Sequence, residues 1–423
     1  MTDARAVGRG GAPAPGPDAA AWHGRAPHLV AAATVLLVVG AALWGAATWA
    51  VALERRYAHA LAPRQFHQKD RGTALQRAAF TQADLLPVYG SSELQTLEDP
   101  YHASNLFMAY PTGFTVFPVG DIGSTTLIMV QSMAAIGDGA RGRKVVFSLS
   151  PYWYYQVKDY SQEYAGNFSA LQAGELMFGP RLSLDLKARI ARRMLRYPVT
   201  LAPRPILRLA AGALAEGSPG GRMLYAMVWP LGALQNLVLR LQDHWEPVAY
   251  LRQQRLDDSP ARRPAPIDWT AVLARAQSDF ASHNGNNPFG FDNHYFTKKF
   301  KRARAKNTLS DSSFRVGLSR SEEWTDLDLL LRVARELKAR PMILCAPSPG
   351  LYYDSLGLSD TLRREYYRRF EQAVKAYDVP VVSFADHDRD RHFVLDPGAH
   401  PSEMGWAYYD RALDAFFHDG VAR

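Results

Sequence analysis

The chain has 423 residues, of which 47% are hydrophobic and 21% are charged, and its net charge is +8. This composition excludes a disordered or fibrous protein, and the mean hydropathy of -0.22 excludes a polytopic membrane protein. The single cysteine, Cys345, excludes an intrachain disulfide and a thiolate zinc site.

The N-terminal region contains one long apolar segment. Residues 1–28 are rich in Ala, Gly and Pro, and we predict that they form a disordered tail. Residues 29–53 follow as an uncharged run of 25 residues, which is long enough to cross a membrane as a helix. A cleaved signal peptide has a shorter apolar stretch, of about 7–15 residues. We therefore predict a transmembrane signal anchor at 29–53. Arginines flank this segment on both sides, so the positive-inside rule does not set its orientation.

The rest of the chain alternates between predicted strands and helices. Residues 54–84 read as a helical, membrane-proximal segment. Apolar runs predict strands at 85–89, 144–150, 341–346 and 379–384. Helical spacing of apolar residues predicts helices at 322–339, 360–377 and 403–417. This alternation predicts an α/β domain with a parallel sheet at 85–420, interrupted by a helical insertion at about 160–280.

Two segments are strongly basic. Residues 181–208 contain eight Lys or Arg and one acidic residue, Asp185, with apolar side chains between the charges. They fit either an amphipathic surface on anionic headgroups or the solvated face of a helical cap. Residues 298–306 contain six cations in nine residues, which either steer an anionic substrate or are simply solvated. Both segments lack the interleaved aromatics of single-strand nucleic-acid binders, so we predict no nucleic-acid partner.

A Gly-Ser-Ser motif directly follows the first predicted strand, as Gly90-Ser91-Ser92. A serine at a strand-to-helix turn exposes its hydroxyl at the carboxyl end of the sheet, near backbone N–H groups that stabilise an oxyanion. Serine alone is a weak nucleophile and needs a base. Without such a base, the motif is more typical of a helix N-cap.

A candidate base lies near the C-terminus, where Asp396 and His400 precede the last predicted helix. The carboxylate would hold the imidazole in one tautomer, and the imidazole would accept the serine proton. Other carboxylates and imidazoles crowd the same region, which makes a divalent metal site the rival interpretation: Asp386, His387, Asp388 and His392. Their spacing matches no metal signature, so we predict no metal and no cofactor.

Several segments that run in order from about residue 85 to 410 resemble the DltD family of the D-alanyl-lipoteichoic acid pathway, within the SGNH (GDSL-like) hydrolase superfamily. They are Gly90-Ser91-Ser92-Glu93-Leu94, His102-Ala103-Ser104-Asn105, Ser150-Pro151 with Trp153, Asn287-Pro288-Phe289-Gly290, Tyr353-Asp354, and His400 with Gly405-Trp406. The resemblance implies an SGNH-hydrolase-like parallel sheet flanked by helices, with the helical insertion and one N-terminal transmembrane helix.

The same resemblance assigns roles to site residues. Ser92 would be the nucleophile, His400 the base and Asp396 its orienting carboxylate. Gly120 or Gly123 would complete the oxyanion hole. Asp396 lies four residues before His400, where the family has three, so this loop carries one extra residue.

The implied function is that of a serine-dependent acyltransferase in the D-alanylation of an anionic envelope polymer, either teichoic acid or lipopolysaccharide. The protein would be held in the cytoplasmic (inner) membrane by a single pass, with its catalytic domain on the extracytoplasmic or periplasmic side. The implied partners are a polytopic membrane O-acyltransferase, an upstream D-alanyl carrier protein and the polymer itself. Two alternatives stay open: an esterase or thioesterase that hydrolyses an acyl ester, and a non-catalytic scaffold that binds the polymer.

Overall fold

The structure is a computed structural model that describes residues 26–95, 98–155, 159–253, 263–284, 287–300 and 310–419. The chain separates into two compact units, Met1–Ala50 and Val51–Arg423. Helix α2 (Ala26–Leu61) begins in the first unit and contains the predicted anchor. Among the described helices, α2 alone is long and apolar enough to cross a membrane.

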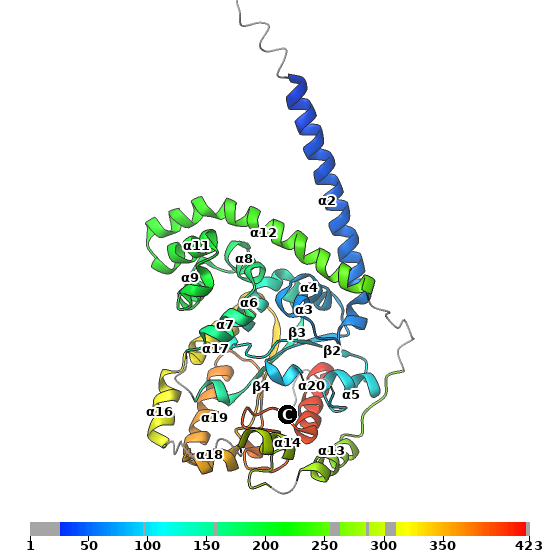
Figure 1. The fold of residues 1–423 in the computed structure, drawn as a ribbon, viewed down its shortest axis with the longest axis vertical. Coiled ribbons are helices and arrows are strands. Elements are labelled where there is room, and N and C mark those ends of the chain that lie inside the picture. The colour runs from blue at the N-terminus through cyan, green and yellow to red at the C-terminus, as the bar shows by residue number, and fades with distance from the viewer. Residues whose placement is uncertain are drawn as a thin grey trace, which may run out of the picture. The chain divides into compact units, whose positions relative to one another are not determined.

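The second unit is built on a five-stranded parallel sheet with the order β2-β1-β3-β4-β5 (Figure 1). The strands are β1 (Leu85–Tyr89), β2 (Thr115–Val119), β3 (Lys144–Leu149), β4 (Arg340–Cys345) and β5 (Val381–Ser383). The α/β class and the parallel sheet are therefore confirmed, and the arrangement is consistent with an SGNH-like fold. Strand β2 was not predicted. It lies at the edge of the sheet and contains Pro118, a residue that sheets tolerate at their edges.

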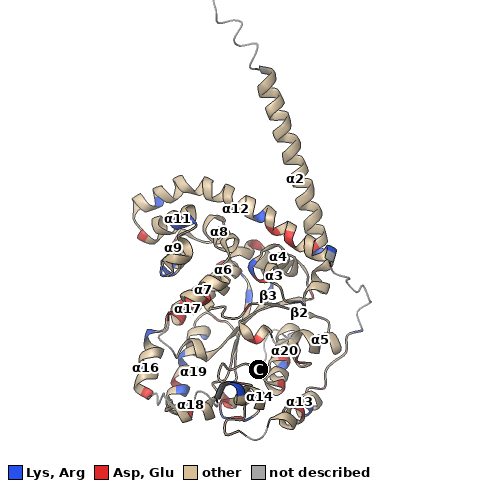
Figure 2. Ribbon diagram, viewed as in Figure 1, with Lys and Arg blue, Asp and Glu red and all other residues tan. Residues whose placement is uncertain are grey.

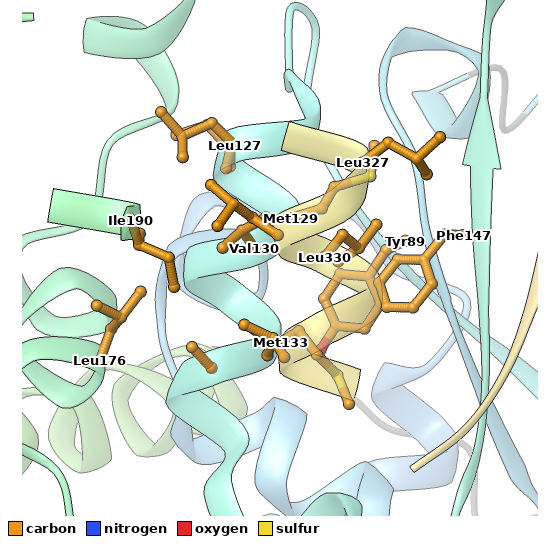
Figure 3. Packing of buried hydrophobic residues seen from close by; sticks show 14 of the residues in the cluster. Tyr89, Leu127, Met129, Val130, Met133, Phe147, Leu176, Ile190, Leu327 and Leu330 are labelled. Carbon is orange, nitrogen blue, oxygen red and sulfur yellow. The ribbon is translucent and has the colours of Figure 1, made fainter. Parts of the chain in front are cut away.

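Helices cover both faces of the sheet. Side chains alternate along each strand, so that Tyr89 and Phe147 enter one hydrophobic cluster while Val88 and Val146 enter the other. The first cluster is shown in Figure 3 and includes residues of α4 (Ala74–Thr81), α6 (Thr126–Ile136), α8 (Ala170–Phe178), α9 (Leu184–Met194), α17 (Glu323–Glu336) and α19 (Asp360–Lys375). The second includes residues of α5 (Ala103–Ala109), α13 (Trp269–His283) and α20 (Glu403–Asp419).

Most of the remaining helices lie between β3 and β4 in the chain. They are η3 (Pro151–Trp153), α7 (Ser161–Asn167), α10 (Pro198–Leu201), α11 (Pro205–Glu216), α12 (Pro219–Gln253), α14 (Asn293–Tyr295), η4 (Phe296–Phe300) and α16 (Asp311–Arg320). Shorter elements elsewhere are α3 (His67–Arg71), η1 (Ser92–Gln95), η2 (Gly137–Ala140), α18 (Gly350–Leu356) and η5 (Ala385–His387). The segment at 54–84 is helical, and Leu61, Leu75 and Phe80 pack into the first cluster.

The basic segment at 181–208 buries most of its apolar side chains, although Leu184 and Val199 are exposed. Leu186, Ile190 and Met194 on α9 are buried in the first cluster. Arg193 is also buried and makes a bidentate ion pair with Asp326, with both N–O distances at 2.7 Å. The core therefore covers the apolar face of α9, and the interpretation of this helix as an amphipathic membrane surface is wrong. Most of the second basic run, 298–306, lies outside the described residues.

Candidate active site

Gly90 carries the chain from the carboxyl end of β1 into η1, which begins at Ser92. Gly120 follows β2 and comes so close that a Cβ added to it would lie 2.2 Å from the carbonyl oxygen of Gly90. Its φ of +154° also favours glycine. Two glycines thus allow the ends of β1 and β2 to meet beside the serine turn.

Ser92, His400 and Asp396 form one hydrogen-bonded chain. The Ser92 Oγ lies 2.6 Å from the His400 Nε2, and the His400 Nδ1 lies 2.8 Å from the Asp396 Oδ1. The imidazole is 23% exposed, whereas the carboxylate is 2% exposed. A buried carboxylate in this position fixes the imidazole tautomer and stabilises an imidazolium as it forms.

The neighbouring serine is placed differently. The Ser91 Oγ is buried and has no hydrogen-bond partner in the part of the chain that the structure describes. The Ser91 backbone N–H donates to the Glu93 Oε1 at 3.1 Å. Of the two serines, therefore, the structure brings Ser92 to the imidazole.

A tight turn accommodates the extra residue between Asp396 and His400. The Ala399 N–H donates to the Asp396 carbonyl at 3.1 Å, and Ala399 takes a left-handed φ of +63°. The Gly398 N–H donates to the Asp396 Oδ1 at 2.9 Å. A Cβ on Gly398 would approach the His400 Cε1 to 3.0 Å, so glycine leaves room for the imidazole. The turn thus holds the carboxylate and the ring in contact across four positions.

The other carboxylates of this region are directed elsewhere. Asp388 is buried and pairs with the buried Arg363, whose Nε donates to the Asp388 Oδ2 at 2.7 Å. Asp386 is exposed. Asp396 is therefore the carboxylate that the structure places against His400. Among the described residues, no group of three or more His, Cys, Asp or Glu is arranged to hold a metal ion.

A cavity of about 390 Å³ opens at the serine. Residues that follow or end three strands line it: Ser92 after β1, Ser148 and Ser150 at the end of β3, and Ala346 after β4. The chain adds β2 on one side of β1 and β3 on the other, so the strand order reverses between β1 and β3. Ligands bind at such a switch point, beyond the carboxyl ends of the strands. The sheet topology alone therefore predicts a ligand site at this position.

The two glycines predicted for the oxyanion hole lie in different surroundings. The Gly120 N–H donates to the Asp70 Oδ1 at 2.9 Å, and Gly120 does not line the serine cavity. Gly123 lines the cavity with Ser92, and its φ of +82° favours glycine. An oxyanion donor at Gly120 would have to give up its bond to Asp70, whereas Gly123 lines the cavity.

Half-buried Asp70 and its neighbour Lys69 form a charged pair that the sequence did not reveal. The adjacent Lys69 is fully buried, and its Nζ donates to the carbonyls of Ala62 and Arg64 at 2.6 and 2.7 Å. Burial raises the pKa of Asp70 and lowers the pKa of Lys69. Consecutive charges in a polar helical segment give no sign of burial, so no sequence signal could have found this pair.

Further cavity residues were not predicted as site residues. Tyr152 and Trp153 line the cavity. They lie in a segment that resembles the family, so the resemblance could have identified them as site residues. Glu163, on α7, lies in the helical insertion and had no such signal. The described lining residues include the carboxylates of Glu93, Glu163 and Asp396 but no Lys or Arg.

Two other segments that resemble the family support the structure rather than line the cavity. His102 is buried, caps α5 by accepting the Ser104 N–H at 3.3 Å, and packs against Trp406. Burial is the main cause that lowers the pKa of His102 to about 4, so the ring is neutral at pH 7. The Asn287 side chain accepts the Phe291 N–H at 3.0 Å and donates to the Phe291 carbonyl at 2.6 Å.

Comparison with known proteins finds one family. The family described as "DltD protein" matches residues 62–418. The chain is 30% identical over 372 residues to Protein DltD of Bacillus subtilis (strain 168), covering 86% of this chain and 89% of that one. It is 24% identical over 343 residues to Protein DltD of Staphylococcus aureus (strain NCTC 8325 / PS 47), covering 81% and 83%. It is 23% identical over 396 residues to Protein DltD of Lacticaseibacillus rhamnosus, covering 89% and 92%.

Proposed function

The chain belongs to the DltD family, and from that premise we propose that it is a serine-dependent acyltransferase in the D-alanylation of an anionic cell-envelope polymer. The observation that carries this proposal is the hydrogen-bonded chain Ser92–His400–Asp396 at the mouth of a cavity. Such an arrangement activates a hydroxyl that is otherwise a weak nucleophile.

The proposed reaction has two steps. The Ser92 Oγ attacks the carbonyl carbon of an activated D-alanyl group, and the His400 Nε2 accepts the hydroxyl proton. The tetrahedral intermediate collapses, the leaving group takes the proton from His400, and a D-alanyl ester forms on Ser92. A hydroxyl of the acceptor then attacks this ester while His400 accepts its proton, and the Ser92 Oγ leaves and is reprotonated. Asp396 stabilises the imidazolium in both steps.

The proposed oxyanion donors are the backbone N–H groups of Ser92 and Gly123. Both residues line the cavity, whereas the Gly120 N–H is engaged by Asp70. Donors fixed in place before the reaction stabilise the developing charge without reorganising, and a single donor contributes about 3 kcal/mol.

The charge of the cavity fits an acyl group that bears an ammonium. A D-alanyl ester carries such a group, and the described lining residues offer three carboxylates and no Lys or Arg. Glu163, which lines the cavity from α7, is the carboxylate proposed to recognise the ammonium. The net charge of +8 suits a polyanionic acceptor.

We place the protein in the cytoplasmic (inner) membrane, with the second unit on the extracytoplasmic side. Support comes from the apolar segment at 29–53 and from helix α2. A polytopic O-acyltransferase that carries activated D-alanyl groups across the membrane is the proposed donor, supplied by a D-alanyl carrier protein. The acceptor is teichoic acid or lipopolysaccharide. A fused reporter at the C-terminus that is active only in the cytoplasm would overturn this topology.

The experiment that tests the function is mass analysis of the envelope polymer for D-alanyl esters in cells with and without this chain. Complementation by wild-type protein but not by Ser92→Ala is the expected result. Unchanged esters in the deletion strain would overturn the proposal.

Hydrolysis is the second candidate function, because the imidazole is partly exposed and water can reach the serine. Release of free D-alanine at the same rate with and without the acceptor polymer would favour an esterase or thioesterase. Failure of a fluorophosphonate probe to label Ser92 in folded protein would favour the non-catalytic scaffold.

A further inference from the structure

Helix α12 packs on the domain through one face only. Tyr225, Asn236 and Asp243 lie on this buried face. The Tyr225 hydroxyl donates to the Met177 carbonyl at 2.5 Å, and the Asn236 Nδ2 donates to the Glu175 Oε1 at 2.8 Å. These polar contacts determine which side of the helix faces the domain, so the opposite side of the helix faces away from it.

The opposite side of α12 is apolar and exposed. Its large side chains, which we call the α12 apolar face, are Met223, Leu224, Met227, Leu231, Leu234, Leu237, Val238 and Trp245. Met227 is 69% exposed and Leu234 is 60% exposed. No Asp or Glu occurs from Gly217 to Gln242, and Figure 2 shows most of α12 without charge. Soluble monomers rarely leave so extended an apolar stripe in water.

The C-terminal half of α12 contacts the chain where it leaves the predicted anchor. Residues 29–53 form the apolar segment, and the next residue, Glu54, is buried with its Oε1 2.8 Å from the His244 Nδ1. One residue earlier on α12, the Asp243 Oδ2 accepts the Thr73 N–H at 2.8 Å. Because Glu54 directly follows the segment, chain connectivity keeps this part of α12 close to the point where the anchor ends.

We propose that the α12 apolar face lies in the interface of the bilayer that holds the anchor, at the boundary of headgroups and acyl chains. An amphipathic helix lies in this position when one face is apolar and the other is polar or covered. Trp245, on this face, is a side chain of the type that membrane interfaces favour. The inference rests on the membrane anchoring in the proposed function, and it assigns the second unit its own contact with lipid.

The test uses the full-length chain in lipid nanodiscs that contain no other protein. Cys345 is buried, so a thiol-reactive environment-sensitive fluorophore would label an introduced cysteine selectively. Met227→Cys and Leu234→Cys report on the α12 apolar face. Val316→Cys is the matched control, since Val316 is exposed on α16, which lies away from α12 (Figure 1).

We expect blue-shifted emission at positions 227 and 234, and quenching there by lipids that carry a nitroxide near the headgroup. Position 316 should show neither effect. Aqueous emission without quenching at both α12 positions would overturn the proposal. Blue-shifted emission at positions 227 and 234 that appears only after a polytopic membrane protein is added would also overturn the proposal, since the α12 apolar face would then bind protein.

Labelling of Ser92 by a fluorophosphonate in the same nanodiscs separates this inference from the proposed function. If positions 227 and 234 show aqueous emission while the probe labels Ser92, only the proposed lipid contact is contradicted. If positions 227 and 234 are in contact with lipid while the probe does not label Ser92, the lipid contact is supported and the catalytic proposal is contradicted.

Discussion

The Asp70 Oδ1 accepts a 2.9 Å hydrogen bond from the Gly120 backbone N–H, across 50 positions of the sequence. This bond ties the helical segment that follows the predicted anchor to the turn after β2. Gly120 in turn contacts Gly90, the residue before the serine turn. The carboxylate of Asp70 therefore supports the site without lining its cavity.

Replacing Asp70 tests this support. We expect Asp70→Ala to lower the free energy of unfolding by about 3 kcal/mol, because Gly120 loses its acceptor and buried Lys69 loses its neighbouring charge. Asp70→Asn keeps an acceptor oxygen and should cost about 1 kcal/mol. Chemical unfolding of the full chain in detergent measures both. Equal losses in the two variants would show that the hydrogen bond to Gly120 contributes nothing.

The two adjacent serines give a direct test of the nucleophile. Ser92→Ala and His400→Ala should each lower D-alanyl transfer by roughly 10³-fold or more, and the double variant should be little worse because these groups act as a unit. Ser91→Ala is the matched control and should keep most activity, since the Ser91 side chain does not contact the imidazole. Loss of transfer in Ser91→Ala with activity kept in Ser92→Ala would reverse the assignment.

Two buried aspartates separate orientation of the base from stability of the fold. Asp396→Asn should lower turnover by about 10⁴-fold with little change in unfolding, because the imidazole loses its orienting carboxylate. Asp388→Asn should instead lower the free energy of unfolding by about 2 kcal/mol, because it leaves buried Arg363 with Asp354 as its remaining carboxylate partner. Activity and thermal unfolding are measured on both variants. A severe activity loss in folded Asp388→Asn, with Asp396→Asn unaffected, would contradict this division.

Local sequence patterns predicted much of the fold. Strands β1, β3, β4 and β5 and helices α17, α19 and α20 have strong apolar periodicity, and all appear near their predicted positions. Helix α6 could not be recognised in this way, because every one of its residues is buried and no polar face remains to set a helical period.

The site was harder to predict because its parts meet only in three dimensions. Ser92 and His400 are 308 positions apart, so residue types alone made them candidates for one site, and resemblance to a family assigned their roles. The roles of Asp70 and Glu163 depend on burial and on a cavity wall, which no local pattern encodes. The bidentate pair of Arg193 with Asp326 likewise shows why a basic run does not predict a free basic surface.

The contact between Glu54 and α12 should make stability depend on pH. The hydrogen bond to Glu54 is the largest cause that raises the pKa of His244, Asp243 adds to it, and burial and Arg77 oppose it. Stabilisation by the protonated ring is therefore complete below the unfolded pKa, near 6.5, and is lost as pH rises through the higher folded pKa. We expect the melting temperature of the wild type to fall over that interval. His244→Gln should lose about 2 kcal/mol at pH 6 and less at pH 9, and a loss independent of pH would contradict the mechanism.

Glu163 offers a test of substrate recognition that is independent of the nucleophile. If its carboxylate pairs with the D-alanyl ammonium, Glu163→Gln should lower kcat/KM for a D-alanyl thioester about tenfold, the effect of losing roughly 1.4 kcal/mol of transition-state binding. The same variant should process an N-acetyl-D-alanyl thioester as the wild type does, because that substrate has no ammonium. Glu365→Gln, at an exposed surface ion pair, is the matched control and should change neither rate. An equal loss of kcat/KM for both thioesters in Glu163→Gln would show that this side chain supports α7 and the cavity wall and does not recognise the ammonium of the acyl group.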